Sequence, residues 1–351
     1  MKKFLPYFIL IALLGAAAIW FVLHKSSGTL DKEEGAFAVE NKNDIQKIVL
    51  VDTDKKRLEL TKNGSLWLVN GRFPAREEML QSLLEAVTRV TSLSPVPNAA
   101  HDNVIRELLA KNVKVEVYTG KDEKPAKTYY VGGATVRNDG TYMLLETDGH
   151  MAVHPHITYI PGLHGYITGR FNTDEEVWRS KVLFNYTSAE IKSISVEYPG
   201  DEQNSFTVNH IAADSFSLSP KEGKYEINKP YQQNYLKQFT AFFSNISFEA
   251  FDNNFPQKDS MMHTMPFCIF TITEKDNSVN KVSVYYMPVS ERSKQQFDPK
   301  GNEMTYDIDH YHASIHNDKD FVIIQYYVFG KMFRAYKDFF FTPPVVTTKG
   351  K

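Results

Sequence analysis

The sequence predicts an α+β protein in which an N-terminal transmembrane helix precedes two similar β-rich α+β units. Three observations predict this: an uncharged apolar stretch at the N-terminus, many short β-rich segments separated by turns, and one amphipathic helical segment at the same place in each half. The expected boundaries are 1–25 for a membrane anchor, 26–36 for a polar linker, 37–170 for the first unit and 171–351 for the second.

The N-terminal segment is long and apolar enough to span a bilayer. Residues 4–23 carry no charge, and as a helix they would be about 30 Å long, the thickness of one hydrocarbon core. The alternative is a cleaved signal peptide, which has a shorter apolar stretch and small residues followed by a polar region. Here the small residues 15–18 lead into further apolar residues, and Trp20 suits a membrane interface. The sequence therefore favours an uncleaved anchor.

The charges around this segment predict its orientation. Lys2 and Lys3 precede the apolar run, whereas Lys25 and the net acidic stretch 31–34 follow it. Basic residues flanking a span stay in the cytoplasm, so the N-terminus is expected there. In a bacterium this predicts a single-pass protein of the inner (cytoplasmic) membrane with its C-terminal bulk in the periplasm. No cysteine lies directly after the run, which excludes bacterial lipidation.

The composition is that of a folded exterior part. Hydrophobic residues make up 42% and aromatic residues 13% of the chain, and roughly 325 residues follow the anchor, enough for two domains. The net charge of −2 and the lack of a dense basic block argue against a nucleic-acid partner. Cys268 is the one cysteine, so no internal disulfide can form, and its apolar surroundings predict a buried side chain.

The first unit is expected to begin with three short strands. After them, 76–93 has the apolar spacing of an amphipathic helix, with Glu77 and Glu78 in the first turn, where the helix dipole favours acidic residues. The expected elements, in order, are strands 44–52, 56–62 and 65–71, helices 76–93 and 101–112, and strands 113–120, 127–133 and 141–147.

The second half repeats this plan. Segment 190–199 matches segment 44–52, and a helix with apolar residues on one face again follows three strands. We interpret the pattern as an internal duplication, although β-rich chains can look alike without one. The expected elements are strands 190–199, 204–210 and 215–220, helix 235–251, and strands 266–274, 281–288, 305–315 and 320–330.

Several segments resemble a known bacterial family. They are SLWLVNGRFPAREEMLQSLLEAVTRV, VKVEVYTG, TYYVGG, GTYMLLE, YIPGLHGYITGRF and DEEVWRSKVLFNY. Together they are similar to the family described as domain of unknown function 4340, most of all to its Bacteroidetes-type members, over residues 37–200 and more loosely beyond. In some bacteria, similar domains are encoded beside transport-type ATPases related to gliding machinery. The resemblance implies an accessory role at the cell envelope and supplies no catalytic residues.

Three histidines lie where the first unit ends. On a strand, His154 and His156 would share a face at a separation of about 6.6 Å, and His164 could fold back towards them to complete a zinc site. Against this, Pro155 interrupts a strand ladder and no carboxylate follows until Asp174. We therefore interpret this glycine- and proline-rich stretch as a turn-rich connection between the two units.

His310 and His312 are the better candidates for metal ligands. On a regular strand these two side chains share one face, whereas Asp307 and Asp309 share the other, so the four cannot converge on one ion. The preferred interpretation is a half-exposed strand without a metal, and His310 and His312 remain weak candidates.

Common catalytic signatures are missing from the sequence. It contains no GxSxG, HExxH or GxxxxGK[ST] motif, and the glycines of 131–140 lack the spacing of a phosphate-binding loop. The sequence therefore predicts no catalytic residue and no cofactor.

These observations predict a membrane-anchored periplasmic module without catalysis, which binds or accompanies an envelope or transport-type complex. The alternative is a metal-dependent periplasmic hydrolase that uses the strand of His310 and His312. A third hypothesis places a ligand between the two units. The aromatic-rich stretch 326–341 is either a partner surface or a closing part of the second core.

Overall fold

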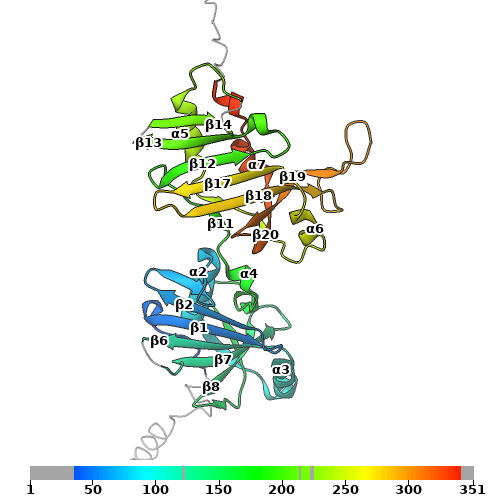
Figure 1. Cartoon of the computed structure of the whole chain (residues 1–351). Helices are drawn as coiled ribbons and strands as arrows, with labels where there is room; N and C mark the ends of the chain where they lie inside the picture. Colours follow the sequence, from blue (N-terminus) through cyan, green and yellow to red (C-terminus); the bar gives the residue numbers. More distant parts are fainter. Residues whose placement is uncertain (1–34, 121–122, 213–214, 222–224, 341–351) are drawn as a thin grey trace, which may run out of the picture. The chain divides into compact units, whose positions relative to one another are not determined.

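The computed structural model describes residues 35–120, 123–212, 215–221 and 225–340 (Figure 1). The chain divides into two compact units, Met1–Ser180 and Lys181–Lys351. The expected anchor lies outside the described residues, as does most of the expected linker. Of the helices that are described, none has the length and apolar character needed to cross a membrane.

The predicted fold class, an α+β protein with a transmembrane helix, is wrong. The structure is mostly β-sheet: 39% of the residues are in strands, which form several sheets, and 22% are in helices. One reason is that the expected helices end early. The helix expected at 76–93 is α2 (Glu77–Arg89), after which the chain continues as strand β5 (Thr91–Pro95). Strand β10 (His156–Tyr159) supplies the hydrogen-bonding partner for β5, and that pairing overrides the helical periodicity.

The same correction applies to the helix expected at 235–251. Helix α5 covers only Gln233–Ala241, and Asn245 then adopts a positive φ of 51°, a conformation incompatible with continuing the helix. The remainder forms β15 (Ile246–Ser247) and β16 (Ala250–Phe251), which pair with other strands of the second unit.

The first unit contains a ten-stranded antiparallel sheet in the order β4-β3-β2-β1-β6-β7-β8-β10-β5, with β9 paired to β8. The three strands expected first and the three expected after the helices are confirmed. The remaining bounds are η1 (Lys42–Asp44), β1 (Ile45–Asp52), β2 (Arg57–Asn63), β3 (Leu66–Val69), β4 (Phe73–Pro74), α3 (Asn98–Ala110), β6 (Val113–Thr119), β7 (Lys127–Ala134), β8 (Thr141–Thr147), β9 (His150–Met151), η2 (Thr168–Arg170) and α4 (Glu175–Trp178).

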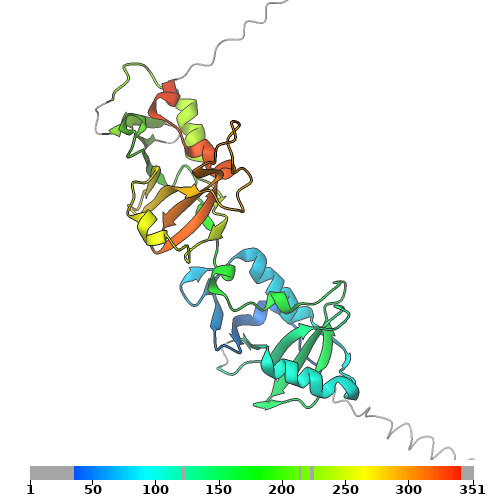
Figure 2. The same cartoon turned by 90° about the vertical axis from the view of Figure 1, so that its right-hand side faces the viewer.

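Both faces of this sheet are covered. Helix α2 and the segment after β10 bury apolar side chains on one face, where Trp67, Leu83 and Tyr129 belong to one core cluster. Helix α3 lies across β7 and β8 (Figure 2) and forms a second, smaller cluster that includes Leu108. Gly132 permits this close approach, because a Cβ atom there would lie 2.6 Å from Leu108 Cδ2.

The second unit contains an eight-stranded antiparallel sheet in the order β14-β13-β12-β17-β18-β19-β20-β16, and β11 pairs with β15 in a separate two-stranded sheet. The elements not yet given are β11 (Val182–Phe184), β12 (Ile191–Glu197), η3 (Glu202–Asn204), β13 (Phe206–Ala212), β14 (Ser215–Pro220), α6 (Lys258–Met262), β17 (Cys268–Glu274), β18 (Val279–Pro288), β19 (Tyr306–Ile315), β20 (Asp320–Gln325), α7 (Tyr326–Phe329), η5 (Gly330–Met332) and η6 (Tyr336–Phe340).

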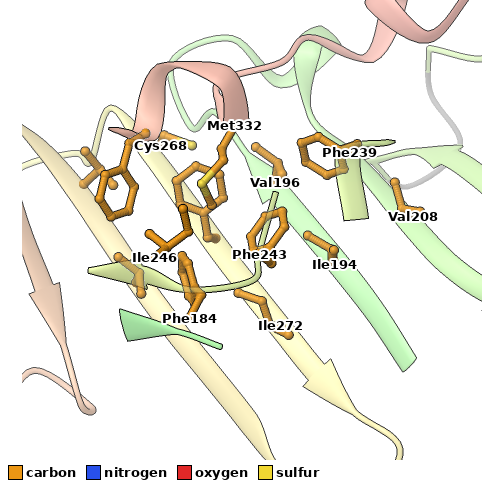
Figure 3. Close-up of a cluster of buried hydrophobic side chains, with 14 of the residues drawn as sticks. Phe184, Ile194, Val196, Val208, Phe239, Phe243, Ile246, Cys268, Ile272 and Met332 are labelled. Atoms are coloured by element: carbon orange, nitrogen blue, oxygen red, sulfur yellow. The ribbon is translucent and has the colours of Figure 1, made fainter. Parts of the chain in front are cut away.

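The core of the second unit is rich in aromatic rings. Phe184, Phe243 and Phe270 are all fully buried, and the ring centroids of Phe184 and Phe243 lie 5.2 Å apart. Met332 comes in from the C-terminal segment to pack over the same strands (Figure 3). Cys268 is buried within this cluster and its thiol is free, as its apolar surroundings predict.

The two units share one strand order. Reading from β3 in the first sheet gives β3-β2-β1-β6-β7-β8-β10-β5, and the second sheet runs β14-β13-β12-β17-β18-β19-β20-β16, with each strand at the matching place along the chain. The irregularity in pairing is also repeated: β1 shifts register against β6 between Ile45 and Lys47, and β12 shifts against β17 between Ile191 and Ser193. The match therefore extends to individual hydrogen-bonded residues.

The boundary between the units differs from the expected one. The division falls after Ser180, not after residue 170, because Phe171 and Trp178 are buried in the core of the first unit. The Trp178 Nε1 atom donates to the Asn172 carbonyl at 2.8 Å, and the Ser180 amide donates to the Pro74 carbonyl at 2.8 Å. Residues 171–180 thus close the first unit.

Candidate functional site

The three histidines at the end of the first unit have separate surroundings. His156 is buried on β10, with Nδ1 2.6 Å from the Ser92 hydroxyl. His154 lies before the strand and its ring is 6.0 Å from that of His101, whereas His164 is exposed in a loop. Within the described residues, no group of three or more His, Cys, Asp and Glu side chains could hold a metal ion. The expected shared face of His154 and His156 does not form, because β10 begins only at His156.

His312 is an interior residue. Its side chain is 0% exposed, its Nε2 lies 3.0 Å from Asp252 Oδ2, and the rings of Phe255 and Phe321 pack against it at 4.5 and 4.8 Å between centroids. Its Nδ1 is also buried and has no hydrogen-bond partner among the described residues. Burial lowers the pKa of His312 despite the opposing effect of Asp252, so the imidazole is neutral at pH 7. A substrate cannot reach this ring without local unfolding.

His310 contacts a different pair of carboxylates. Its Nδ1 lies 3.2 Å from Asp307 Oδ1, and its Nε2 lies 3.3 Å from Glu249 Oε2. The expectation that Asp307 lies on the opposite face from His310 is wrong. The register between β18 and β19 shifts between Tyr286 and Pro288, and this irregularity turns the Asp307 carboxylate back along its own strand.

Asp307 organises this irregular stretch. Its Oδ1 accepts the amides of Asp309 at 2.8 Å and His310 at 3.0 Å, and its Oδ2 accepts the Ser293 hydroxyl at 2.6 Å. Burial by itself would raise the pKa of Asp307, but these hydrogen bonds outweigh burial and hold that pKa below its usual value. The carboxylate therefore has a sufficient structural role as an acceptor for its own loop.

The described residues do not assemble a nucleophilic triad around these histidines. Ser314 is the serine next to His312 on the same face of β19, yet its hydroxyl donates to Asp318 at 2.5 Å. The Cys268 thiol is buried, and burial raises its pKa well above its ordinary value, which disfavours the reactive thiolate. The geometry around His310 and His312 thus serves packing and loop closure.

An exposed groove lies next to this histidine strand. Strands β18 and β19, the connection 289–305 and helix α7 line an open groove of about 760 Å³. We call it the tyrosine groove, after Tyr286, Tyr306, Tyr311 and Tyr326. The connection projects from the sheet as the orange loop in Figure 1.

The four rings form a continuous series. Tyr286 stacks on Tyr306 with centroids 4.9 Å apart, Tyr311 lies 5.9 Å from Tyr286, and Tyr326 lies 6.4 Å from Tyr311. Three of the rings are accessible: Tyr286 is 42%, Tyr306 47% and Tyr326 50% exposed. Contiguous exposed apolar surface marks binding sites more often than apolar residues that are scattered singly.

The rim of the tyrosine groove is acidic. Four carboxylates, those of Asp298, Glu303, Asp307 and Asp309, line it together with the tyrosines, and none of its described lining residues is basic. Lys294 approaches Asp309 only at 4.0 Å from outside the groove, and the lysine side chain is 81% exposed. Asp307 is buried and held by its own loop and His310, so the accessible negative charge of the groove comes from Asp298, Glu303 and Asp309.

The described part of the aromatic-rich stretch 326–341 mainly closes the core of the second unit, and whether it also binds a partner stays a prediction. Phe329, Met332 and Phe339 are buried in the second core, whereas Tyr326 faces the tyrosine groove. Sequence reasoning found this stretch but missed the other three groove tyrosines. The sequence does show tyrosines in the segments that form β18 and β19. Only the register of these strands shows that the rings are neighbours.

Comparisons with known proteins add no relative. No protein-family profile, no curated protein and no solved structure matches the chain.

Proposed function

We propose that this protein is a non-catalytic binding module, held at the inner membrane by its N-terminal segment, with its bulk in the periplasm. In this proposal it is an accessory component of an envelope or transport-type complex. The apolar run before residue 25 and the resemblance to the domain of unknown function 4340 family support the location and the setting. The observation that carries the binding role is the exposed tyrosine groove.

The chemistry of the groove indicates the kind of partner. Tyrosine supplies large contact area at low conformational cost, and it is enriched at the energetic centres of protein interfaces. The acidic rim would attract lysine or arginine, whose side chains also pack on tyrosine faces. We therefore propose a protein partner that presents a basic segment to the groove.

The test is recovery of partners from native membranes. The full-length chain is purified in mild detergent as the wild type, as Tyr286→Ala/Tyr306→Ala, and as a matched control, Tyr327→Ala. Tyr327 is 92% exposed and is not a lining residue of the groove. Mass spectrometry identifies the copurifying proteins, and thermal unfolding checks that all three chains are folded.

We expect one partner at stoichiometric amount with the wild type and with Tyr327→Ala. Two truncated interface tyrosines cost about 2 kcal/mol or more each, so the double variant should lose that partner. Equal recovery with the double variant would remove the groove from the interface, and recovery of the wild-type protein alone would overturn the accessory role.

The metal-dependent hydrolase gains no support from the structure. His312 is fully enclosed, and the two histidines contact different carboxylates. No observation on the described residues favours this second function over the binding role.

A further inference from the structure

A second cleft lies in the same unit but shares no lining residue with the tyrosine groove. It lies between α5 and η6, has a volume of about 680 Å³, and is closed on a third side by Ile227 and Lys229. We call it the α5–η6 cleft. Its volume falls within the range of roughly 300–1,000 Å³ typical of sites for single small molecules.

The interior of the α5–η6 cleft is aromatic. Phe239 and Phe339 form its floor; both are buried, and their ring centroids are 5.5 Å apart. Tyr235, Phe242 and Phe340 are only partly buried and line its walls. An apolar ligand would therefore cover ring surface that water now contacts, and the hydrophobic effect favours this burial.

The rim of this cleft is basic. Lys229, Arg334 and Lys337 are exposed at its edge, and within the described part of the chain none of the three forms an ion pair with a carboxylate. Asp338 is the one acidic lining residue, and its Oδ2 already accepts the Ala335 amide at 3.0 Å. The three basic side chains outnumber the one carboxylate of Asp338, so the rim above the apolar interior has a net positive charge.

We propose that the α5–η6 cleft binds a single-chain anionic amphiphile, a ligand with one hydrocarbon chain that ends in a carboxylate or phosphate. The chain would lie against Phe242 and Phe340, and the anionic end would meet Arg334 and Lys337. Arginine suits this role because its planar donors match the oxygens of either group. The inference is independent of the tyrosine groove and of any partner that the groove binds.

The probe is dodecyl phosphate, titrated by calorimetry into the full-length protein in its purification detergent. The same titration into the detergent buffer alone gives the heat of partition into micelles, which is subtracted. Dodecanol tests the need for the anion, inorganic phosphate tests the need for the chain, and dodecanoate tests the choice of anionic group. We expect saturable binding of dodecyl phosphate and of dodecanoate, and at least tenfold weaker binding of dodecanol and of inorganic phosphate.

The matched variants reverse two charges each. Arg334→Glu/Lys337→Glu changes the rim, and Lys55→Glu/Lys319→Glu makes the same change at exposed lysines that line neither the cleft nor the tyrosine groove. The rim variant should weaken dodecyl phosphate binding about tenfold or more, and the control should leave binding unchanged. Phe242→Ala should also weaken the binding, because it removes a contact with the hydrocarbon chain of the ligand and leaves the charges of the rim unchanged.

Three results would overturn the proposal. The first is equal affinity in the rim variant and its control, and the second is equal affinity for dodecanol and dodecyl phosphate. The third is that dodecyl phosphate binds only to a protein truncated after residue 340. The occupant of the cleft would then be the protein's own C-terminal segment. In every case the copurification of a partner through the tyrosine groove should be unaffected, so failure here is distinguishable from failure of the proposed function.

Discussion

Replacing Trp178 with alanine should destabilise the first unit, although the sequence places this residue beyond that unit's expected end. The indole is 0% exposed and belongs to the core that α2 covers. Removing a buried tryptophan side chain from a core costs about 3–5 kcal/mol. The Nε1 bond to the Asn172 carbonyl adds little, because Asn172 is exposed and water can replace that donor.

Tryptophan fluorescence isolates the first unit. The chain has three tryptophans, and Trp67 and Trp178 are the two in the described residues, both in the first unit. In a Trp20→Phe background, urea unfolding followed by Trp67 should show the loss directly. With a slope of about 2 kcal/mol per M of urea, Trp178→Ala should lower the midpoint by about 2 M.

A matched change just beyond the boundary gives the control. Val182 is 44% exposed on β11 of the second unit, so Val182→Ala should leave the Trp67 transition unchanged. A loss below about 1 kcal/mol for Trp178→Ala would show that residues 171–180 are not part of the first core, and the division after Ser180 would be refuted.

Three further perturbations test other parts of the structure. Because the pKa of His312 is lowered in the fold, the unfolded chain binds more protons, so the second unit should lose stability as the pH falls below about 6.5. His312→Gln should reduce the difference in stability, measured by circular-dichroism unfolding, between pH 7.5 and pH 5.5. If the variant keeps the full difference, the loss of stability at low pH does not come from His312. Gly132→Ala should destabilise the first unit by about 1–3 kcal/mol in urea, since its Cβ would meet Leu108 Cδ2 at 2.6 Å, whereas Gly133→Ala has open space and should cost less than half as much. The buried Cys268 thiol should resist a thiol reagent in the native protein and react once urea unfolds it; rapid native labelling would contradict its burial.

Several strands and helices could be predicted because their pattern is local. Segments 44–52 and 190–199 have the composition of strands and are β1 and β12, and the apolar stripe beginning at Glu77 is α2. The predicted helix ends were wrong where a strand partner exists. Residues 91–93 were expected to end the helix, yet they belong to β5 and pair with β10, and no local signal shows that β10 lies beside them.

The candidate site was less predictable than the strands. The alternation of His310 and His312 was visible in the sequence, but their different fates depend on contacts from other elements. Asp252, sixty positions before His312 in the chain, holds its imidazole in the interior, and the register shift in β19 brings Asp307 to His310. The sequence predicted a common ligand face, and long-range pairing separated the two residues.

The sequence by itself determined the short strands, the first amphipathic helix and the repeated plan of the two halves, since each depends on residues within a few positions of one another. Only the tertiary structure decided the unit boundary after Ser180, the mostly β character, and the meeting of Tyr286, Tyr306, Tyr311 and Tyr326 in one groove. Periodicity is encoded along the chain, whereas the choice of partner strand and its register is settled by which faces can be buried together.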